Sequence, residues 1–384
     1  MKRTRHLYGG LTVLALIASA CGGPPTPEAT AEVAMPEATG RTGSSGDPLF
    51  LVDPLWPKEL PEDWMFGNVV GVAVDSRDNV WIVHRPRSQN GSAGTPAVLA
   101  FDQDGTVVKS WGGKDAIPEW GTQEHGLYID YQDNVWVGFG GGLPYDINTR
   151  ATTDNAHLLK LSPDGELLLA IDEFGMGTEG SNSTTYLGQP TDVYVDPETD
   201  EAFITDGYTN RRIIVVDANT GQYKRHWGAY GNPPDDTPPQ TMASRRTADG
   251  PQPQQFNTPH CIAGADDGLL YVCDRGNQRI QIFQRDGTFV SDAFVKTADD
   301  DGPGAAPQDM DFSRDPEQRL LFVISGGTVY AIDRETLEVT ALFGRRGRQA
   351  GQFLSAHSGT LDSQGNLYVT ETLDGSRIQK FVRQ

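Results

Sequence analysis

A short hairpin pattern that recurs six times constrains the fold of this chain more than any other feature. Each copy has an alternating apolar strand, a polar turn and a second apolar strand, as in residues 71–83. The later copies begin at Gly126, Asp192, Cys261, Asp309 and Ser358, so the six are spaced by 55, 66, 69, 48 and 49 residues. Alternation of apolar and polar residues with a period of two predicts β-strands and argues against helices. A repeat of this length with polar turns is typical of four-stranded propeller blades.

The last copy shows only three strands before the chain ends, which would leave one blade incomplete. Residues 49–52 carry an apolar strand pattern near the other end of the chain. We expect them to pair with the strand around residues 378–381, because this pairing would complete the sixth blade and cover an exposed sheet edge. The sequence therefore predicts an all-β fold, a six-bladed β-propeller formed by residues 48–384.

The first residues have the pattern of an export signal. Lys2, Arg3 and Arg5 precede an apolar stretch, residues 11–20, that is too short for an ordinary membrane span. Small residues then lead to Cys21, as in the lipobox of a bacterial lipoprotein, although Ala18 stands where the usual leucine would. We predict a lipoprotein signal peptide at residues 1–20 and lipidation of Cys21. The alternative is an ordinary cleaved signal with an incidental cysteine.

Residues 21–47 are rich in Pro, Ala, Thr, Glu and Gly and have almost no large apolar side chains. Such a segment cannot bury enough surface to offset its ordering entropy, so we expect a flexible tether. A lipidated Cys21 would hold the exported protein at a membrane of the cell envelope, on its periplasmic or outer face, without spanning the membrane. The formal net charge of -21 argues against nucleic acid as a partner, because that would need a cationic surface. We expect a monomer that contacts the membrane only through its lipid.

Two further cysteines, Cys261 and Cys273, lie in the two strands of the fourth hairpin. Export would permit a disulfide, and the register of the hairpin would place the two residues opposite each other. Two separate buried thiols are the alternative.

Histidines occupy one register position in alternate copies of the repeat. The residues just before the first strand of the six copies are, in order, Val70, His125, Thr191, His260, Gln308 and His357. Alternate blades of a six-bladed propeller lie about 120° apart around its axis, so three inward-pointing histidines would converge on the channel. Three histidines with one open position are a ligand set of catalytic zinc. The alternative is that each histidine caps a turn or lines a solvated channel, which we expect for the off-register His6, His157 and His226.

A second register position lies at the exit of the second strand. Arg85 in the first copy and Arg275 in the fourth would lie on opposite blades, and Tyr208 follows the same exit in the third copy. The two arginines could bind a substrate anion at the mouth of the channel, or they could pair with acidic residues of neighbouring blades. We expect the structural role for three arginines that precede third strands, Arg211, Arg279 and Arg377.

Residues 256–283 closely resemble an NHL repeat, and the chain from about residue 70 onward resembles peptidyl-α-hydroxyglycine α-amidating lyase. The likeness is densest in the segments QPTDV (189–193) and TDGYTNRRI (205–213), and it is clear in residues 71–85, 120–130 and 259–275. That family is a six-bladed propeller whose zinc is held by three histidines, which match His125, His260 and His357. Its functional tyrosine matches Tyr208, and its two functional arginines match Arg85 and Arg275. The resemblance therefore implies a zinc-dependent lyase.

The chain departs from this family at two points. Thr209 stands where the family has a cysteine, so that disulfide of the family is absent. The structural calcium of the family takes backbone carbonyls that match Val72 and Leu127, and an aspartate at the position of Ser358. Because serine replaces the carboxylate, we hold a calcium ion doubtful in this chain.

The implied reaction cleaves the C–N bond of a small α-hydroxy amide or peptide-like carbinolamide and gives an amide and glyoxylate or a similar keto acid. Zinc would stabilise the developing negative oxygen, Tyr208 would take the hydroxyl proton, and Arg85 and Arg275 would bind the substrate carboxylate. The alternative from another class is a non-catalytic NHL propeller that binds a protein or ligand at the cell envelope. A third hypothesis is a zinc lyase or hydrolase for another small carbinolamide or ester.

Overall fold

The computed structural model describes residues 40–41, 50–61, 63–140, 156–171, 180–237, 252–296 and 304–384. The predicted signal peptide, Cys21 and nearly all of the predicted tether lie outside these residues, so export and lipidation stay predictions. Within the described part of the chain, no helix is both long enough and apolar enough to cross a membrane.

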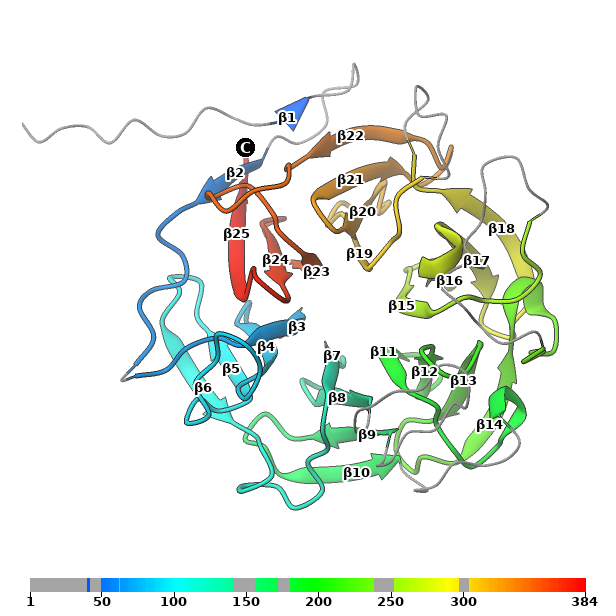
Figure 1. Ribbon diagram of the computed structural model, residues 1–384. Coiled ribbons are helices and arrows are strands. Elements are labelled where there is room, and N and C mark those ends of the chain that lie inside the picture. Colours follow the sequence, from blue (N-terminus) through cyan, green and yellow to red (C-terminus); the bar gives the residue numbers. More distant parts are fainter. Residues whose placement is uncertain are drawn as a thin grey trace, which may run out of the picture. The chain divides into compact units, whose positions relative to one another are not determined.

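The described strands form six antiparallel sheets arranged as the blades of a propeller around a central axis (Figure 1). Blade one comprises β3 (Asn68–Val74), β4 (Val80–Arg85), β5 (Val98–Phe101) and β6 (Val107–Trp111). Blade two comprises β7 (Glu124–Ile129), β8 (Val135–Gly140), β9 (Ala156–Leu161) and β10 (Leu167–Ile171). Blade three comprises β11 (Pro190–Asp196), β12 (Glu201–Asp206), β13 (Arg212–Asp217) and β14 (Tyr223–Trp227).

The second half of the ring repeats the same meander. Blade four comprises β15 (Pro259–Gly264), β16 (Leu269–Asp274), β17 (Arg279–Gln284) and β18 (Phe289–Phe294). Blade five comprises β19 (Asp309–Phe312), β20 (Leu320–Ser325), β21 (Thr328–Asp333) and β22 (Val339–Phe343). Blade six comprises β23 (Ala356–Leu361), β24 (Leu367–Glu371) and β25 (Arg377–Arg383), completed by β2 (Phe50–Asp53). The predicted six-bladed propeller is confirmed.

The ring closes through a strand from the other end of the chain. β2 pairs antiparallel with β25, with Phe50 opposite Arg383 and Val52 opposite Phe381. This closure was expected from the sequence, and it is confirmed for the described residues of that segment. A further two-residue strand, β1 (Gly40–Arg41), pairs with β22 at the outer edge of blade five. Strand pairing therefore begins before residue 48, inside the segment predicted to be a tether.

Turn chemistry explains why the first hairpin forms where it does in blades one, two and six. In blade one, the Asp75 carboxylate accepts hydrogen bonds from the Asn79 backbone N–H, the Asn79 side-chain amide and the Trp81 indole N–H. Asp130 in blade two and Asp362 in blade six bond in the same way to the residues four and six positions later. One aspartate thus fixes both the turn and the aromatic side chain of the next strand.

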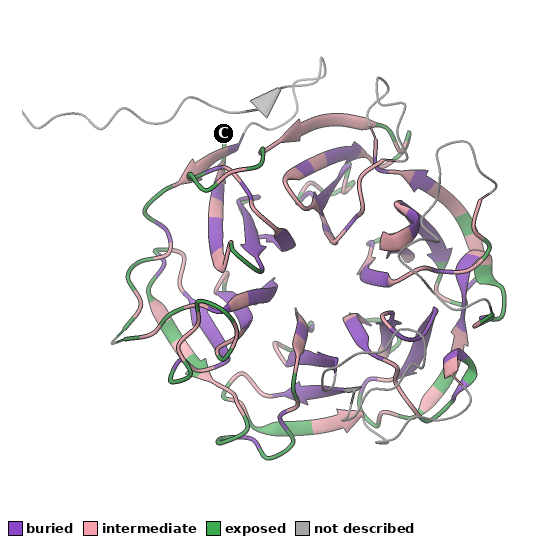
Figure 2. Ribbon diagram, viewed as in Figure 1, coloured by how far each residue is buried: buried purple, intermediate pink, exposed green. Residues whose placement is uncertain are grey.

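The hydrophobic core is divided into six layers, each between two neighbouring blades. One cluster joins Trp81 and Val83 of blade one to Leu127 and Val137 of blade two. Five further clusters join the remaining pairs of neighbouring blades, including blades six and one across the closure. Figure 2 shows that the inner strands are mostly buried, whereas exposed residues gather on the outer strands and loops. Each blade packs against a neighbour on both faces, and this packing fixes the position of every inner strand around the channel.

Buried acid–arginine pairs tie the second strand of a blade to its third strand. Arg279 donates from Nε to Asp274 at 2.8 Å, and Arg377 donates to Glu371 in the same arrangement. In blade three the paired residue is Arg212, which bonds to Asp206 at 2.9 Å. Arg211, for which the sequence predicted a structural role, is also buried and donates from Nη1 to the Asp235 carbonyl at 3.1 Å. The residue of blade three in register with Arg279 is Arg212, the first residue of β13.

Cys261 and Cys273 lie opposite each other in the first hairpin of blade four. Their Cα atoms are 5.0 Å apart, inside the ~7 Å that a disulfide can span, and their sulfur atoms are bonded.

Candidate functional site

Three histidines converge on the axis of the propeller. His125, His260 and His357 are the second residues of β7, β15 and β23, and their ring centroids are 4.8, 4.9 and 5.1 Å apart. Each residue offers a ring nitrogen, and these three nitrogens lie within 4.8 Å of one another. Among the described residues, no other group of three or more His, Cys, Asp or Glu side chains gathers in this way.

The three histidines lie on β-bulges inside the first strand of their blades. The sequence pattern had predicted them just before these strands. The register of blade two shifts between His125 and Leu127, and the shifts in blades four and six span His260 and His357. A β-bulge turns a side chain out of the regular alternation of a strand and is common beside active sites. Here it directs each imidazole into the channel.

A carbonyl oxygen of the next blade fixes the orientation of each ring. His125 donates from Nδ1 to the Thr191 carbonyl at 2.9 Å, and His260 donates from Nδ1 to the Gln308 carbonyl at 2.6 Å. His357 Nδ1 lies 3.3 Å from the Ser358 hydroxyl and also faces the Val70 carbonyl. The Ser358 hydroxyl donates to the same carbonyl at 3.1 Å. A carbonyl can only accept, so Nδ1 of His125 and His260 carries the proton and Nε2 keeps its lone pair.

The electrostatic environment keeps the three rings neutral. Burial, His357 and Arg85 lower the pKa of His125 well below its usual 6.5. Burial and Arg275 do the same for the pKa of His260, and burial with Arg85 and Arg275 lowers the pKa of His357 to about 3. Neutral imidazole is the form that binds metal ions, so all three side chains are in the ligand state.

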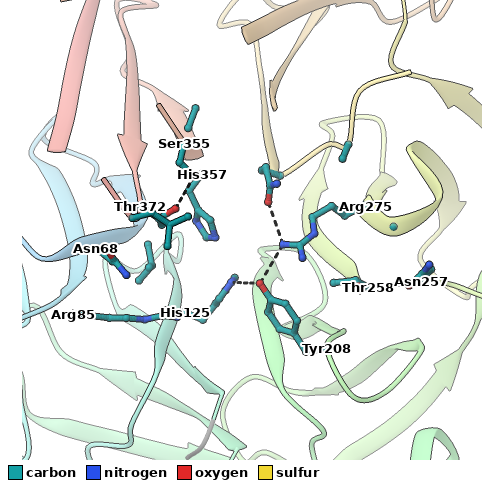
Figure 3. A pocket seen from close by; sticks show the side chains of 16 residues that line it. Asn68, Arg85, His125, Tyr208, Asn257, Thr258, Arg275, Ser355, His357 and Thr372 are labelled. Carbon is teal, nitrogen blue, oxygen red and sulfur yellow. Dashed lines mark hydrogen bonds between the residues drawn. The ribbon is translucent and has the colours of Figure 1, made fainter. Parts of the chain in front are cut away.

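Tyr208 lies directly beside the histidine cluster. It follows β12, and its hydroxyl is 3.2 Å from Nε2 of His125 and 3.2 Å from Nε2 of His260. Arg275, in the short 3-10 turn η4 (Arg275–Asn277), donates from Nη1 to the Tyr208 oxygen at 3.1 Å. Figure 3 shows Tyr208 between His125 and Arg275. The phenolic oxygen is thus held between two imidazoles and a guanidinium.

Gln308 supports this arrangement, and its role was not predicted from the sequence. Its side-chain oxygen accepts from Arg275 Nη1 at 3.2 Å, and its backbone carbonyl accepts from His260. One residue of blade five therefore positions both an arginine and a histidine of the site. The available signal was its register, because Gln308 occupies the same position in its repeat as the three histidines.

Arg85 reaches the site from blade one, with part of its guanidinium already engaged. Nε and Nη2 donate to the Glu124 backbone carbonyl at 2.9 and 2.7 Å. The Glu124 side chain accepts from the Trp120 indole at 2.9 Å, and burial raises the pKa of this carboxyl group. Arg85 therefore lies against blade two, immediately before His125.

These residues border a pocket of about 300 Å³ at the mouth of the channel. Its wall includes Arg85, His125, Tyr208, Arg275 and His357. The structure thus brings together the predicted catalytic side chains with two of the predicted metal ligands in one cavity. His260, the third predicted metal ligand, lines a smaller space together with His125 and His357, which border both spaces.

The residues matched to a calcium site face the opposite end of the channel. Val72 and Leu127 line a cavity of about 470 Å³ there, together with Asp192 and Asp309. The Ser358 hydroxyl instead donates to the Val70 carbonyl beside His357. A neutral hydroxyl in that role supplies no carboxylate, so the residues present do not make the calcium site of the resembled family.

The remaining described histidines have structural contacts. His84 accepts from the Gly67 N–H at 3.2 Å and bonds through Nε2 to the Pro96 carbonyl at 2.9 Å. His157 stacks on Phe139, and His226 contacts the Tyr223 hydroxyl. None of the three reaches the histidine cluster.

Comparison with known proteins gives one family match and several distant relatives. Residues 256–283 match the NHL repeat, the same segment that the sequence pattern singled out. NHL repeat-containing protein 3 of Mus musculus is 27% identical over 264 residues, which are 67% of this chain and 63% of that protein. Peptidylglycine alpha-amidating monooxygenase of Rattus norvegicus is 28% identical over 242 residues, 57% of this chain and 21% of that protein. The chain thus spans less than two thirds of either relative.

A third relative is similar along most of its length. A probable peptidyl-alpha-hydroxyglycine alpha-amidating lyase of Caenorhabditis elegans is 24% identical over 329 residues, 81% of each chain. Among solved structures, a streptogramin B lyase has a TM-score of 0.52 at 13% identity and covers 87% of this chain and 98% of that one. That likeness shows the propeller fold. The expected resemblance to NHL propellers and to proteins named as amidating lyases is confirmed, at low identity.

Proposed function

We propose that this protein is a metal-dependent lyase that cleaves the C–N bond of an α-hydroxyglycine-type carbinolamide and releases an amide and glyoxylate. The observation that carries this proposal is the convergence of His125, His260 and His357 beside Tyr208 and Arg275 in one pocket. A relative named as such a lyase along 81% of its length supports the choice of reaction.

The donor set fits a zinc ion. The three rings are buried, their pKa values are lowered, and in His125 and His260 a carbonyl holds the proton on Nδ1. Outer partners of this kind orient metal-binding histidines and fix their tautomer. His125, His260 and His357 would hold the ion, which would act as a Lewis acid toward a substrate oxygen.

Tyr208 would take the proton of the substrate α-hydroxyl. Arg275 donates to the Tyr208 oxygen, and its guanidinium carbon is 5.2 Å from the centre of the tyrosine ring. This guanidinium holds the phenolic oxygen beside the histidines. Once the hydroxyl proton is lost, a C=O bond forms, the C–N bond breaks, and the departing amide nitrogen takes up a proton. Tyr208 could return the same proton.

The substrate carboxylate is assigned to the arginines. Arg275 uses Nη1 for Tyr208 and Gln308, and Arg85 uses Nε and Nη2 for the Glu124 carbonyl. Each guanidinium has further N–H groups beyond these bonds. Two arginines on opposite sides of the pocket would orient a glyoxylate-like anion and offset charge that develops during the reaction.

Two measurements on purified protein test this function. Elemental analysis should find about one zinc per chain, and an assay with N-acetyl-α-hydroxyglycine should detect glyoxylate and acetamide. Protein that contains no metal and forms no glyoxylate after incubation with zinc would contradict the proposal. That result would favour the rival class, an NHL propeller that binds a partner without catalysis.

A further inference from the structure

We propose that a second cavity, between blades one and two, binds the acyl side of the substrate and selects an uncharged apolar or aromatic acyl group. This inference rests on the proposed function, because it names the part of an N-acyl-α-hydroxyglycine that the catalytic pocket does not hold. Neither the sequence pattern nor the resemblance assigns a role to this cavity.

The cavity has a volume of about 560 Å³, larger than the catalytic pocket. It lies between the loop that follows β4 and the segment that connects β6 to β7. Its walls include Pro86, Pro96, Ala97 and the buried Trp120, together with glycine backbone at positions 94, 112, 113 and 121. Ligand pockets of this size and apolar character bind small molecules or groups of them.

Arg85 connects the cavity with the catalytic pocket, because its side chain lines both. The guanidinium bonds to the Glu124 carbonyl, so Arg85 and Glu124 form the boundary between the two spaces. A substrate whose carboxylate approaches Arg275 and whose hydroxyl lies at the histidines would extend its amide past Arg85. The acyl group would then enter the second cavity.

The charges around the cavity favour an uncharged occupant. Arg87 and Asp115 lie on its rim, where they are exposed and 3.8 Å apart, so they offset each other, and Lys114 is a further exposed cation of the lining. The buried carboxyl of Glu124 is satisfied in part by the Trp120 indole N–H, and Arg85 lies beside it. Within the cavity, an apolar or aromatic group would gain contact with Trp120 and the prolines, whereas a charged group would lose its hydration.

Gly94 allows the cavity to be filled without backbone strain. It lies on the wall, has no positive φ, and a Cβ added there would meet only the Ser92 hydroxyl oxygen at 4.0 Å. Gly94→Trp should therefore occupy the acyl space and leave the catalytic pocket unchanged. Gly327→Trp is the matched control, because Gly327 lines neither pocket and its added Cβ makes only ordinary contacts, the nearest at 3.7 Å.

The test compares two pairs of compounds that differ only in the acyl group. Binding of N-acetylglycine and N-benzoylglycine, which lack the hydroxyl needed for cleavage, is measured by calorimetry on the zinc-loaded protein. Turnover of the corresponding α-hydroxyglycines is measured by glyoxylate release. We expect the benzoyl compound to bind about 10-fold more tightly than the acetyl compound, because a phenyl ring leaves water. In Gly94→Trp this ratio should fall to near one, and in Gly327→Trp it should stay.

Equal affinities in the unmodified protein, no binding of N-benzoylglycine, or a ratio that Gly94→Trp leaves unchanged would each overturn the inference. Thermal unfolding checks that the variant is folded, and Ala93→Trp, on the same wall, replaces Gly94→Trp if it is not. Failure of the proposed function is distinguishable. Absence of glyoxylate from both α-hydroxyglycines would contradict the lyase, while the affinity ratio would still decide whether the cavity binds acyl groups.

Discussion

The even-numbered and odd-numbered blades contribute opposite chemistry to the central channel. Blades two, four and six supply imidazoles, and two of these donate from Nδ1 to a carbonyl of the next odd blade. Blades three and five supply carboxylates one position later in the repeat, and these accept from the next even blade. Asp192 accepts from the Ile262 N–H at 3.0 Å, and Asp309 accepts from the Gly359 N–H at 2.9 Å.

The set of three histidines is complete, whereas the set of aspartates is not. All three even blades have their histidine, whereas among the odd blades the first has Gly71 in place of an aspartate. A Cβ at Gly71 would meet the Leu127 backbone nitrogen at 2.5 Å, so blade one packs too closely against blade two for a side chain. A three-fold set suits one ion on the axis, whereas the two carboxylates repel each other. The predictions below test this division from its largest expected effect to its smallest.

Removal of any one histidine should have the largest effect. His260→Ala, and likewise the alanine variants at 125 and 357, leaves two ring nitrogens and an unfilled space in the cluster. Loss of an outer partner of a metal ligand already costs about 10–100-fold, so we expect loss of a ligand to exceed ~100-fold in both zinc affinity and glyoxylate release. Elemental analysis and the turnover assay check this. His226→Ala, outside the cluster, should keep both, and a histidine variant that retains full metal would separate the cluster from metal binding.

Tyr208→Phe should remove the rate and leave the metal. The phenyl ring keeps its place beside Arg275, but the group that accepts the proton is gone. Loss of a general base typically lowers the rate by about 10²–10⁴-fold. Zinc content and thermal stability should match those of the unmodified protein. A Tyr208→Phe variant with normal kcat would show that another group, or water, moves the proton.

The repeat register determined how much of this site could be predicted from sequence. It indicated which blades carry histidines and that Tyr208, Arg85 and Arg275 leave equivalent strands on one side of the ring. It did not reveal that the histidines lie on β-bulges, because each bulge falls at the first residues of its strand, before most of the apolar alternation. The register also did not predict the hydrogen bond from Arg85 to the Glu124 carbonyl. The two residues are 39 positions apart, and the bond depends on the conformation of the arginine side chain. The acyl cavity is formed by loops with no repeat pattern, so no register pointed to it.

Gln308→Leu should have an intermediate effect on kcat/KM. It tests whether a residue of an odd blade positions Arg275. The substitution removes the side-chain acceptor of Arg275 and keeps the backbone carbonyl that His260 needs. We expect kcat/KM to fall about 10-fold, mainly through KM, since Arg275 would bind the substrate carboxylate less well. Gln308→Glu keeps an acceptor and should recover part of the loss. Equal zinc content in both variants is the control, and an unchanged KM would contradict the positioning role.

Asp309→Asn should have the smallest effect and should act on stability rather than on catalysis. Burial raises the pKa of Asp192 to about 7, and burial with the charge of Asp192 raises the pKa of Asp309 well above its usual 3.8. The folded state therefore holds these protons to higher pH than the unfolded state does. The resulting stability is present in full below about pH 4 and is lost as the pH rises through about 7.

Asparagine keeps an oxygen acceptor for the Gly359 N–H but carries no charge. We expect Asp309→Asn to raise the free energy of unfolding at pH 8 by about 1–2 kcal/mol and to leave it nearly unchanged at pH 4. Chemical unfolding at the two pH values measures this difference. An Asp309→Asn variant less stable than the unmodified protein at pH 8 would contradict this prediction. It would show that other groups offset the negative charges of Asp192 and Asp309 in the folded protein.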